Sequence, residues 1–156
     1  MAPRSWIGSY RAFKVYFDAL VALDDDRRIY NAVWKRFPHE IRLLLNNKYV
    51  FAPFWSHQNG LAGCENWADR LAASQRAIAS ALAQSDTPVI LSILFDRLYV
   101  LRNQVVHGGA TWNSGVNRQQ VRDGAAIMDW LLPIFIDIMM DHSDHDWGRP
   151  FYPVVQ

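Results

Sequence analysis

The stretch PVILSILFDRLYVLRNQVVHGG, residues 88–109, decides the fold predicted for this chain. Up to residue 106 it is apolar on nearly every side when wound as a helix, which indicates a helix at the centre of the fold. Asp86 can cap the N-terminus of this helix, and Pro88 suits its first turn. Gly108 and Gly109 then end it. The sequence therefore predicts a central helix over about 88–106.

The rest of the chain has the same helical periodicity, and no internal repeat or second domain is visible. We predict an all-α fold: a single domain over residues 1–156, built as an up-and-down helical bundle with additional short helices. The aromatic tail Trp147–Pro153 is expected to dock on this bundle. Further helices are expected at about 9–23, from Asp24-Asp25-Asp26 to Pro38, onward to about Leu45, at 65–83, and at 117–141 with a kink near Pro133. Residues 46–63 and 107–117 are expected to be loops, the first of them ordered by packed aromatic side chains.

Composition limits the class of protein. A chain of 156 residues that is 51% hydrophobic can bury a core without disulfides, and its single Cys64 fits a reducing cytoplasm. Residues 1–50 hold nine Lys or Arg against five Asp or Glu, whereas residues 51–156 hold seven against ten, so an anionic ligand needs a local site. The most apolar run, Ala125–Met140, is interrupted by charges and is too short to span a bilayer. We expect a cytoplasmic protein with no membrane partner.

A few polar residues interrupt the apolar central helix, and they are the best indication of a functional site. Asp96, Tyr99, Asn103 and His107 lie three or four positions apart, which places them on one stripe of the helix. Arg102 borders this stripe. A polar line on a buried helix requires hydrogen-bond partners, a water channel or an interface. The stripe is therefore the best place to look for a functional site.

The C-terminal end of this helix combines side chains that suit the cleavage of a phosphodiester. Arg102 carries a planar, permanently charged guanidinium, which binds phosphate well. Histidine, here His107, readily takes and returns a proton near neutral pH. Asn103 lies four residues before His107 and can hold its ring in one tautomer. In RNA the neighbouring 2′-hydroxyl would attack phosphorus, while His107 moves a proton and Arg102 offsets the developing charge.

Helix geometry adds a constraint on this pair. Positions 102 and 107 differ by about 140° around an ideal helix and by about 7.5 Å along it, so one chain presents them poorly together. Two copies of the helix that meet at a two-fold axis can bring Arg102 and His107 of both chains into one cleft. The motif therefore predicts a homodimer with the site at the interface.

The Arg102-Asn103 pair, followed after three residues by His107 and then Gly108, resembles the motif of the HEPN superfamily. Members of this superfamily carry an Arg, a polar residue that is often Asn, and a His four to six intervening residues after the Arg. Residues 86–141 resemble uncharacterised bacterial HEPN proteins akin to the Apea-like group, whereas the first half of the chain is similar only in being helical. The resemblance implies a HEPN-like helical bundle that forms dimers.

The same resemblance implies a metal-independent endoribonuclease with a role in toxin–antitoxin or phage-defence systems. It implies RNA as the substrate, no cofactor or metal, and an antitoxin protein as a further partner. Arg102, Asn103 and His107 are then the expected catalytic residues. Tyr99, Trp112 and Asn113 are the expected substrate-binding residues, because they adjoin the motif.

Other interpretations remain open at the level of sequence. Arg102 can instead bind carbonyls at the end of the helix, and His107 can be a cap residue. Some HEPN proteins keep the fold without cleavage, so a non-catalytic module that binds RNA, a nucleotide or a protein is the alternative function. A structural or adaptor protein is a third. His142 and His145, among Asp141, Asp144 and Asp146, are more typical of an exposed connector than of a metal site.

Overall fold

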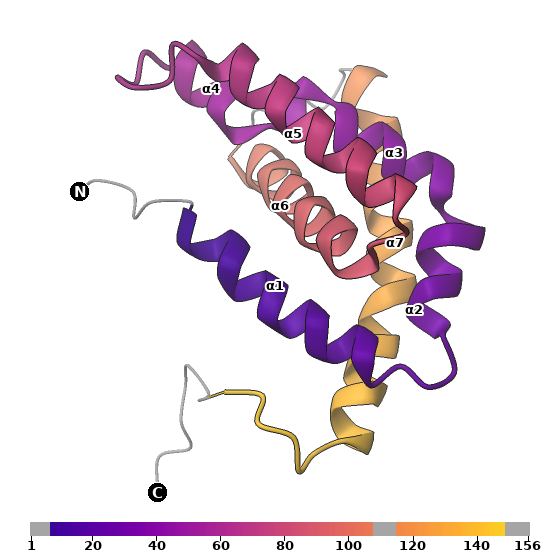
Figure 1. Ribbon diagram of the computed structural model, residues 1–156. Coiled ribbons are helices and arrows are strands. Elements are labelled where there is room, and N and C mark those ends of the chain that lie inside the picture. Colours follow the sequence, from indigo (N-terminus) through magenta and orange to yellow (C-terminus); the bar gives the residue numbers. More distant parts are fainter. Residues whose placement is uncertain (1–6, 108–114, 149–156) are drawn as a thin grey trace, which may run out of the picture.

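The computed structural model describes residues 7–107 and 115–148, with side chains described from residue 13 and, after the gap, from residue 118 (Figure 1). Within these ranges the chain forms helices and no strand, which confirms the all-α prediction. The α-helices are α1 Ile7–Ala22, α2 Arg28–Asn31, α3 Pro38–Asn46, α4 Ala52–Gln58, α5 Trp67–Ala83, α6 Thr87–Val106 and α7 Gly115–Asp141. A π-helical segment, η1 Ala32–Arg36, continues α2, and a short 3₁₀ helix, η2 Lys48–Val50, precedes α4.

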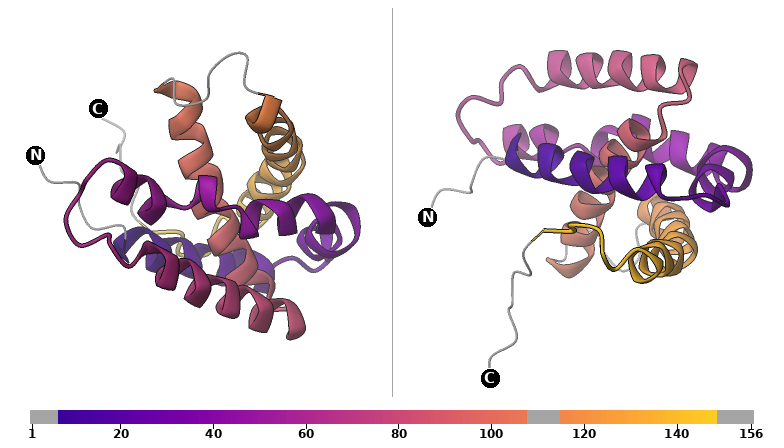
Figure 2. Two further views of the ribbon diagram at one scale, coloured as in Figure 1. Left: turned by 90° about the horizontal axis from the view of Figure 1, so that it is seen from above. Right: turned by 60° about the horizontal axis from the view of Figure 1, so that its bottom comes forward.

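Helix α6 is the central element, as its sequence predicts. Helices α1, α3 and α5 all contact it, and in Figures 1 and 2 it lies among them. Ile90, Leu91 and Leu94 on its N-terminal half are completely buried. Uniform apolarity on most faces of a helix is stable only when other elements cover those faces. The helix that carries the motif is therefore held firmly by the body of the protein.

An aromatic cluster joins α1, α6 and α7 in the core. The ring centroid of Phe17 lies 5.0 Å from that of Phe95 and 5.8 Å from that of Phe135. Phe95 and Phe135 are themselves 5.8 Å apart, so each ring contacts the other two. Tilted pairs at these distances add to the hydrophobic stabilisation from burial. Ile127 and Leu131 of α7 are fully buried in the same core.

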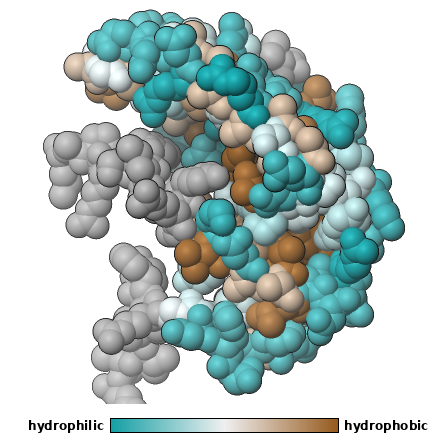
Figure 3. Space-filling view, in the orientation of Figure 1, coloured by the Kyte–Doolittle hydropathy of each residue, from teal (hydrophilic) through white to brown (hydrophobic). Residues whose placement is uncertain are grey.

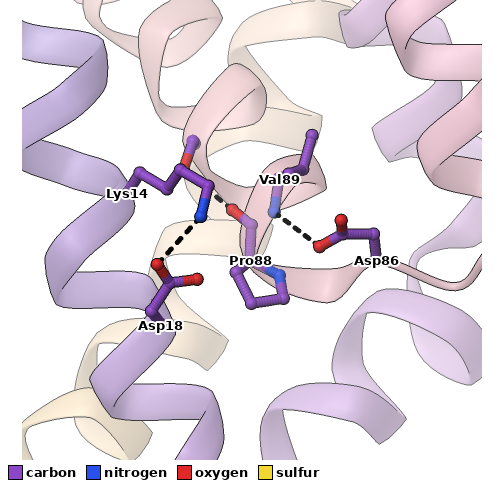
Figure 4. A network of polar contacts seen from close by, with 6 residues as sticks. Lys14, Asp18, Asp86, Pro88 and Val89 are labelled. Carbon is purple, nitrogen blue, oxygen red and sulfur yellow. Dashed lines mark hydrogen bonds and ion pairs between the residues drawn. The ribbon is translucent and has the colours of Figure 1, made fainter.

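Two aspartates start helices as predicted. Both carboxylate oxygens of Asp24 accept backbone N–H groups, from Arg28 at 3.0 Å and from Ile29 at 2.7 Å, which satisfies donors that a helix N-terminus leaves unpaired. Asp86 caps α6 by accepting from the backbone N–H of Val89 at 3.3 Å, and Pro88 occupies the first turn (Figure 4). These caps fix where α2 and α6 begin.

The expectation for residues 46–63 was partly wrong. This segment does carry turns, but it also forms η2 and α4. Its aromatic side chains pack on one another, because the ring of Phe54 makes edge contacts with Tyr49, Trp55 and Trp67 at 4.9–5.6 Å. Prolines and asparagines suggest a loop, yet Pro53 lies in the first turn of α4, where proline is well tolerated.

The boundaries of two helices also differ from the prediction. Ser9 lies inside α1, which starts at Ile7, and so does not cap it. Helix α7 begins at Gly115 rather than Asn117, and Pro133 lies inside it. Boundary errors of this size are typical when several polar residues follow one another near a helix end.

The aromatic C-terminal tail docks as far as it is described. Trp147 packs against the core, and its indole N–H donates to the carbonyl of His142 at 2.9 Å. Gly148 has a φ of +89°, and a Cβ built on it would lie 3.2 Å from the hydroxyl of Tyr16 on α1. The remaining tail residues, to Pro153, lie outside the described residues. Over the described ranges, no helix has the length and apolar character needed to cross a membrane.

Candidate functional site

The predicted catalytic residues lie in and just after the last turn of α6. Arg102 and His107 are exposed, and Asn103, which follows Arg102 in the sequence, is half-buried. His107 is the C-cap residue, and its backbone N–H donates to the carbonyl of Asn103 at 2.9 Å. The motif is therefore open to solvent in the single chain, rather than sealed within its core.

The side chains of the motif are arranged around Arg102. Its Nη1 donates to Oδ1 of Asn103 at 3.1 Å. Asn103 thus holds the guanidinium, whereas the sequence suggested that it would hold the imidazole. Within the described residues no hydrogen bond reaches the His107 ring. The guanidinium is a five-donor fork, so most of its N–H groups are left for other acceptors.

Tyr99 and Arg102 also line a groove between α6 and α7, with Phe13 of α1 at one side. On the face of the molecule seen in Figure 1, hydrophobic residues show between hydrophilic ones (Figure 3). The groove has a volume of about 440 Å³, and Arg102 is its only charged lining residue among those described. We call it the apolar groove. Its walls include Tyr99, Arg102, Val105 and Val106 of α6, and Val121 and Ala125 of α7.

The shape of this groove follows from how α6 and α7 cross. A Cβ added to Gly124 would lie only 3.0 Å from Leu98 Cδ2 and 3.2 Å from Leu101 Cδ2, so α7 approaches α6 closely at this glycine. Beyond it the last turn of α6 and the start of α7 extend past the other described helices (Figure 2, left). The other described helices leave the groove-lining side chains of α6 partly uncovered, and Tyr99 is 46% and Val106 59% exposed.

The N-terminal end of the polar stripe has a structural role. Asp96 accepts from Arg97 Nη1 at 3.1 Å, and Arg97 Nη2 donates to Ser74 Oγ of α5 at 2.8 Å. Arg97 is only 2% exposed, and its guanidinium lies 4.7 Å from the ring centroid of Phe51. Burial raises the pKa of Asp96 above its ordinary value, although the charge and hydrogen bond of Arg97 oppose this rise. The ion pair ties α5, α6 and the segment before α4 together.

Two anchoring residues were missed at the level of sequence. Arg97 follows Asp96 on an apolar helix, and that adjacency was the available signal of a buried pair. Gln104 was missed as well: its Nε2 donates to the carbonyl of Tyr49, which also accepts from Trp55 Nε1 at 2.8 Å. These contacts fix the C-terminal half of α6 against η2 and α4, and so position Arg102 and Asn103.

Two of the predicted substrate-binding residues, Trp112 and Asn113, lie outside the described residues. The histidines after α7 have local partners: His142 Nδ1 lies 3.0 Å from the carbonyl of Ile138, and the ring of His145 is 4.6 Å from that of Trp147. No group of three or more His, Cys, Asp or Glu in the described part of the chain is placed to hold a metal ion.

Comparison of the chain with protein-family models, with curated proteins and with solved structures found no match. What the residues can do must therefore be inferred from their chemistry and placement. The exposed end of α6 carries a guanidinium held by Asn103 and, five positions further on, a histidine, and Arg102 also lines an apolar groove. This combination is suited to binding an anion and to moving a proton beside it.

Proposed function

We propose that this protein is a metal-independent endoribonuclease of HEPN type that acts as a homodimer. The observation that carries the proposal is the exposure of Arg102 and His107 at the end of a helix whose N-terminal half is buried. A structural role favours buried side chains with hydrogen-bond partners. Arg97 on the same helix is such a residue, because it is buried and donates to Asp96 and Ser74. The resemblance to HEPN proteins then supplies RNA as the substrate class and toxin–antitoxin or phage-defence systems as the setting.

In the proposed reaction each residue has one task. The Arg102 guanidinium, held by Asn103, binds the scissile phosphate and offsets the charge that develops on its oxygens. His107 takes the proton of the 2′-hydroxyl, whose oxygen attacks phosphorus as the bond to the 5′-oxygen of the next nucleotide breaks. The 5′-oxygen leaves with a proton from water, and His107 returns its own proton to the solvent. The products are a 2′,3′-cyclic phosphate and a free 5′-hydroxyl. Two chains supply the site, because residues 102 and 107 diverge on one helix.

An RNA-cleavage assay in EDTA tests the activity. Wild type should release fragments that end in 2′,3′-cyclic phosphate, and His107→Ala should lower the rate by at least about a hundredfold. His142→Ala is the matched control, since it removes a histidine that lies away from the α6 terminus, and should keep wild-type activity. Cleavage that survives both His107→Ala and Arg102→Ala would assign the activity to other residues.

Mixed dimers test whether the site is shared. Arg102→Ala and His107→Ala should each be inactive alone. After unfolding and refolding together, half of the dimers are mixed, and each mixed dimer has one intact pair of the two. About a quarter of wild-type activity should therefore return. Absence of any recovery, with mixed dimers demonstrated by mass spectrometry, would place both residues of a working pair in one chain.

A non-catalytic module that binds RNA or a nucleotide is the alternative. One observation favours it: within the described residues, the His107 ring has no hydrogen-bond partner to orient it for proton transfer. Such a module would protect a labelled RNA in both EDTA and Mg²⁺ without generating product. Arg102→Ala would weaken this protection, whereas His107→Ala would leave it nearly unchanged.

A further inference from the structure

We propose that the apolar groove binds a single-chain amphipathic anion, with its alkyl chain along α6 and its carboxylate on Arg102. This site shares Arg102 with the proposed ribonuclease but goes beyond it, because its ligand is a small molecule and its described lining does not include His107. The ligand class follows from three properties of the groove: its size, its lining and the place of its one charge.

Size favours a small molecule. A volume of about 440 Å³ lies within the range of pockets that bind small ligands, about 300–1,000 Å³. The lining residues of α6 run from Phe95 to Val106, a rise of about 16 Å along the helix. Arg102 lies within this run, about 10 Å of helix rise from Phe95 and about 6 Å from Val106, so a chain whose carboxylate is on Arg102 follows one part of the groove rather than its whole length.

The lining favours an alkyl chain. Val105, Val106 and Val121 present only methyl groups, and Ala125 leaves space where a larger side chain would fill the groove. Val105 is 49% exposed, so an alkyl chain that covers it gains hydrophobic stabilisation from apolar surface on both partners. Gly124, Leu98 and Leu101, where the two helices approach closely, are also part of the apolar lining.

The charge favours an anionic head group. Arg102 is the only charged residue in the described lining, and no carboxylate lines the groove to oppose an anion. Its bond to Oδ1 of Asn103 uses one N–H group and orients the planar fork. The other N–H groups can bind both oxygens of a carboxylate, in an arrangement that is stronger than a hydrogen bond between neutral groups. A cation beside an otherwise apolar groove thus matches a molecule with one anionic end.

Calorimetric titration with dodecanoate, kept below the concentration at which it forms micelles, tests the proposal. Wild type should bind dodecanoate, and should bind dodecanol, which has the same chain without the charge, about tenfold more weakly. Arg102→Met should lower the affinity for dodecanoate about tenfold and leave that for dodecanol nearly unchanged. Arg122→Met removes a cation outside the described lining, and should leave both affinities as in wild type.

A second experiment fills the groove with a large side chain. Ala125→Trp should abolish binding of both probes, whereas Ala126→Trp, at a neighbouring exposed alanine outside the lining, should retain it. Circular dichroism and sedimentation confirm that both variants fold and report their oligomeric state. The proposal is overturned if wild type does not bind dodecanoate, or if Ala125→Trp binds it normally.

Two further outcomes would also overturn the proposal. Equal affinity of wild type and Arg102→Met for dodecanoate would remove the role of the charge. Failure of dodecanoate to bind, together with dissociation of a dimer by Ala125→Trp alone, would show that a second copy of the chain covers the groove. Neither result depends on RNA, so the failure of this proposal and that of the proposed ribonuclease can be told apart.

Discussion

Arg97 and Arg102 lie five residues apart on α6, yet their surroundings differ completely. Arg97 is buried and engaged by Asp96, Ser74 and the face of Phe51. Arg102 is exposed and has Asn103 as its hydrogen-bond partner in the described part of the chain. Sequence alone does not separate the two, because both interrupt the same apolar helix. Burial separates them, and favours a role in stability for the first arginine and in ligand binding for the second.

Replacement of Arg97 should show what this buried pair contributes. Arg97→Met leaves Asp96 without its partner, and should lower the free energy of unfolding by about 3 kcal/mol at pH 7. The double variant Asp96→Leu/Arg97→Met should recover much of this loss, since no lone buried charge remains. Urea unfolding curves of the wild type and the two variants measure both effects.

The loss in Arg97→Met should also depend on pH. Burial already raises the pKa of Asp96, and removal of Arg97 takes away the two influences that lower it. A carboxyl whose pKa is higher in the folded than in the unfolded state destabilises the fold once pH exceeds its unfolded pKa. The deficit should therefore be smaller near pH 4 than at pH 7. An equal deficit at both pH values would mean that the charge on Asp96 is not its cause.

Asn103 is predicted to position Arg102 rather than to take part in proton transfer. Asn103→Ala removes the acceptor of the Arg102 Nη1 bond and should lower RNA cleavage by about tenfold. Most of the loss should appear as weaker RNA binding, with KM raised more than kcat is lowered. Asn103→Asp keeps an acceptor for the guanidinium and should retain more activity than Asn103→Ala. A loss confined to kcat would instead support a role for Asn103 in orienting His107.

At the scale of the helices, much of the architecture follows from caps and periodicity. Asp24, Asp86 and Pro38 mark the starts of α2, α6 and α3 as predicted. The helix at 52–58 was not predicted, because Pro53 and the aromatic side chains around it suggested a packed loop. Its stability comes from contacts with distant residues, such as the packing of Phe54 on Trp67 of α5. Such contacts are invisible to a local pattern.

The cap formed by Asp24 should be important for folding. It is 9% exposed and accepts two backbone N–H groups, so Asp24→Ala leaves both without a partner. We expect a loss of about 1–2 kcal/mol in the free energy of unfolding. Asp26→Ala, which removes an exposed carboxylate from the same acidic run, is the control and should change stability little. Equal losses in the two variants would point to general charge effects instead.

At the scale of the molecule, the approach of α7 to α6 at Gly124 determines whether the apolar groove exists. Gly124→Leu must push α7 away from Leu98 and Leu101, and should lower stability by about 1–3 kcal/mol. Leucine is a better helix former than glycine, so a loss in this direction reflects crowding between the helices. Ala126→Leu, at an exposed position, should be nearly neutral in thermal unfolding. A more stable Gly124→Leu variant would show that the helices separate freely.

The sequence suggests candidate residues for the site, which stay a prediction, but does not indicate their surroundings. Arg102, Asn103 and His107 follow from the spacing on one helix and from a family resemblance. The apolar groove depends on Phe13, Val121 and Ala125, which are distant in sequence from α6 and carry no chemical signal of their own. Only the packing of α1 and α7 against α6 brings them beside Arg102. The sequence pattern of one helix cannot predict which residues of other helices will pack beside it.

The π-helical turn after α2 has a consequence for how this chain tolerates change. In Ala32–Arg36 the N–H of Phe37 donates to the carbonyl of Ala32, five residues back, so this turn holds one residue more than regular winding needs. Within this turn Trp34 donates to Thr87 at 2.9 Å, and Arg36 lies 3.8 Å from the ring centroid of Trp130. Deleting a single amino acid here would leave a regular α-helical turn, with the residues before and after it facing nearly the same directions as now. A deletion within a regular helix such as α3 would instead rotate one part of the helix against the other by about 100°. A library of single-codon deletions should therefore show this short segment as more tolerant than the regular helix α3 that follows it.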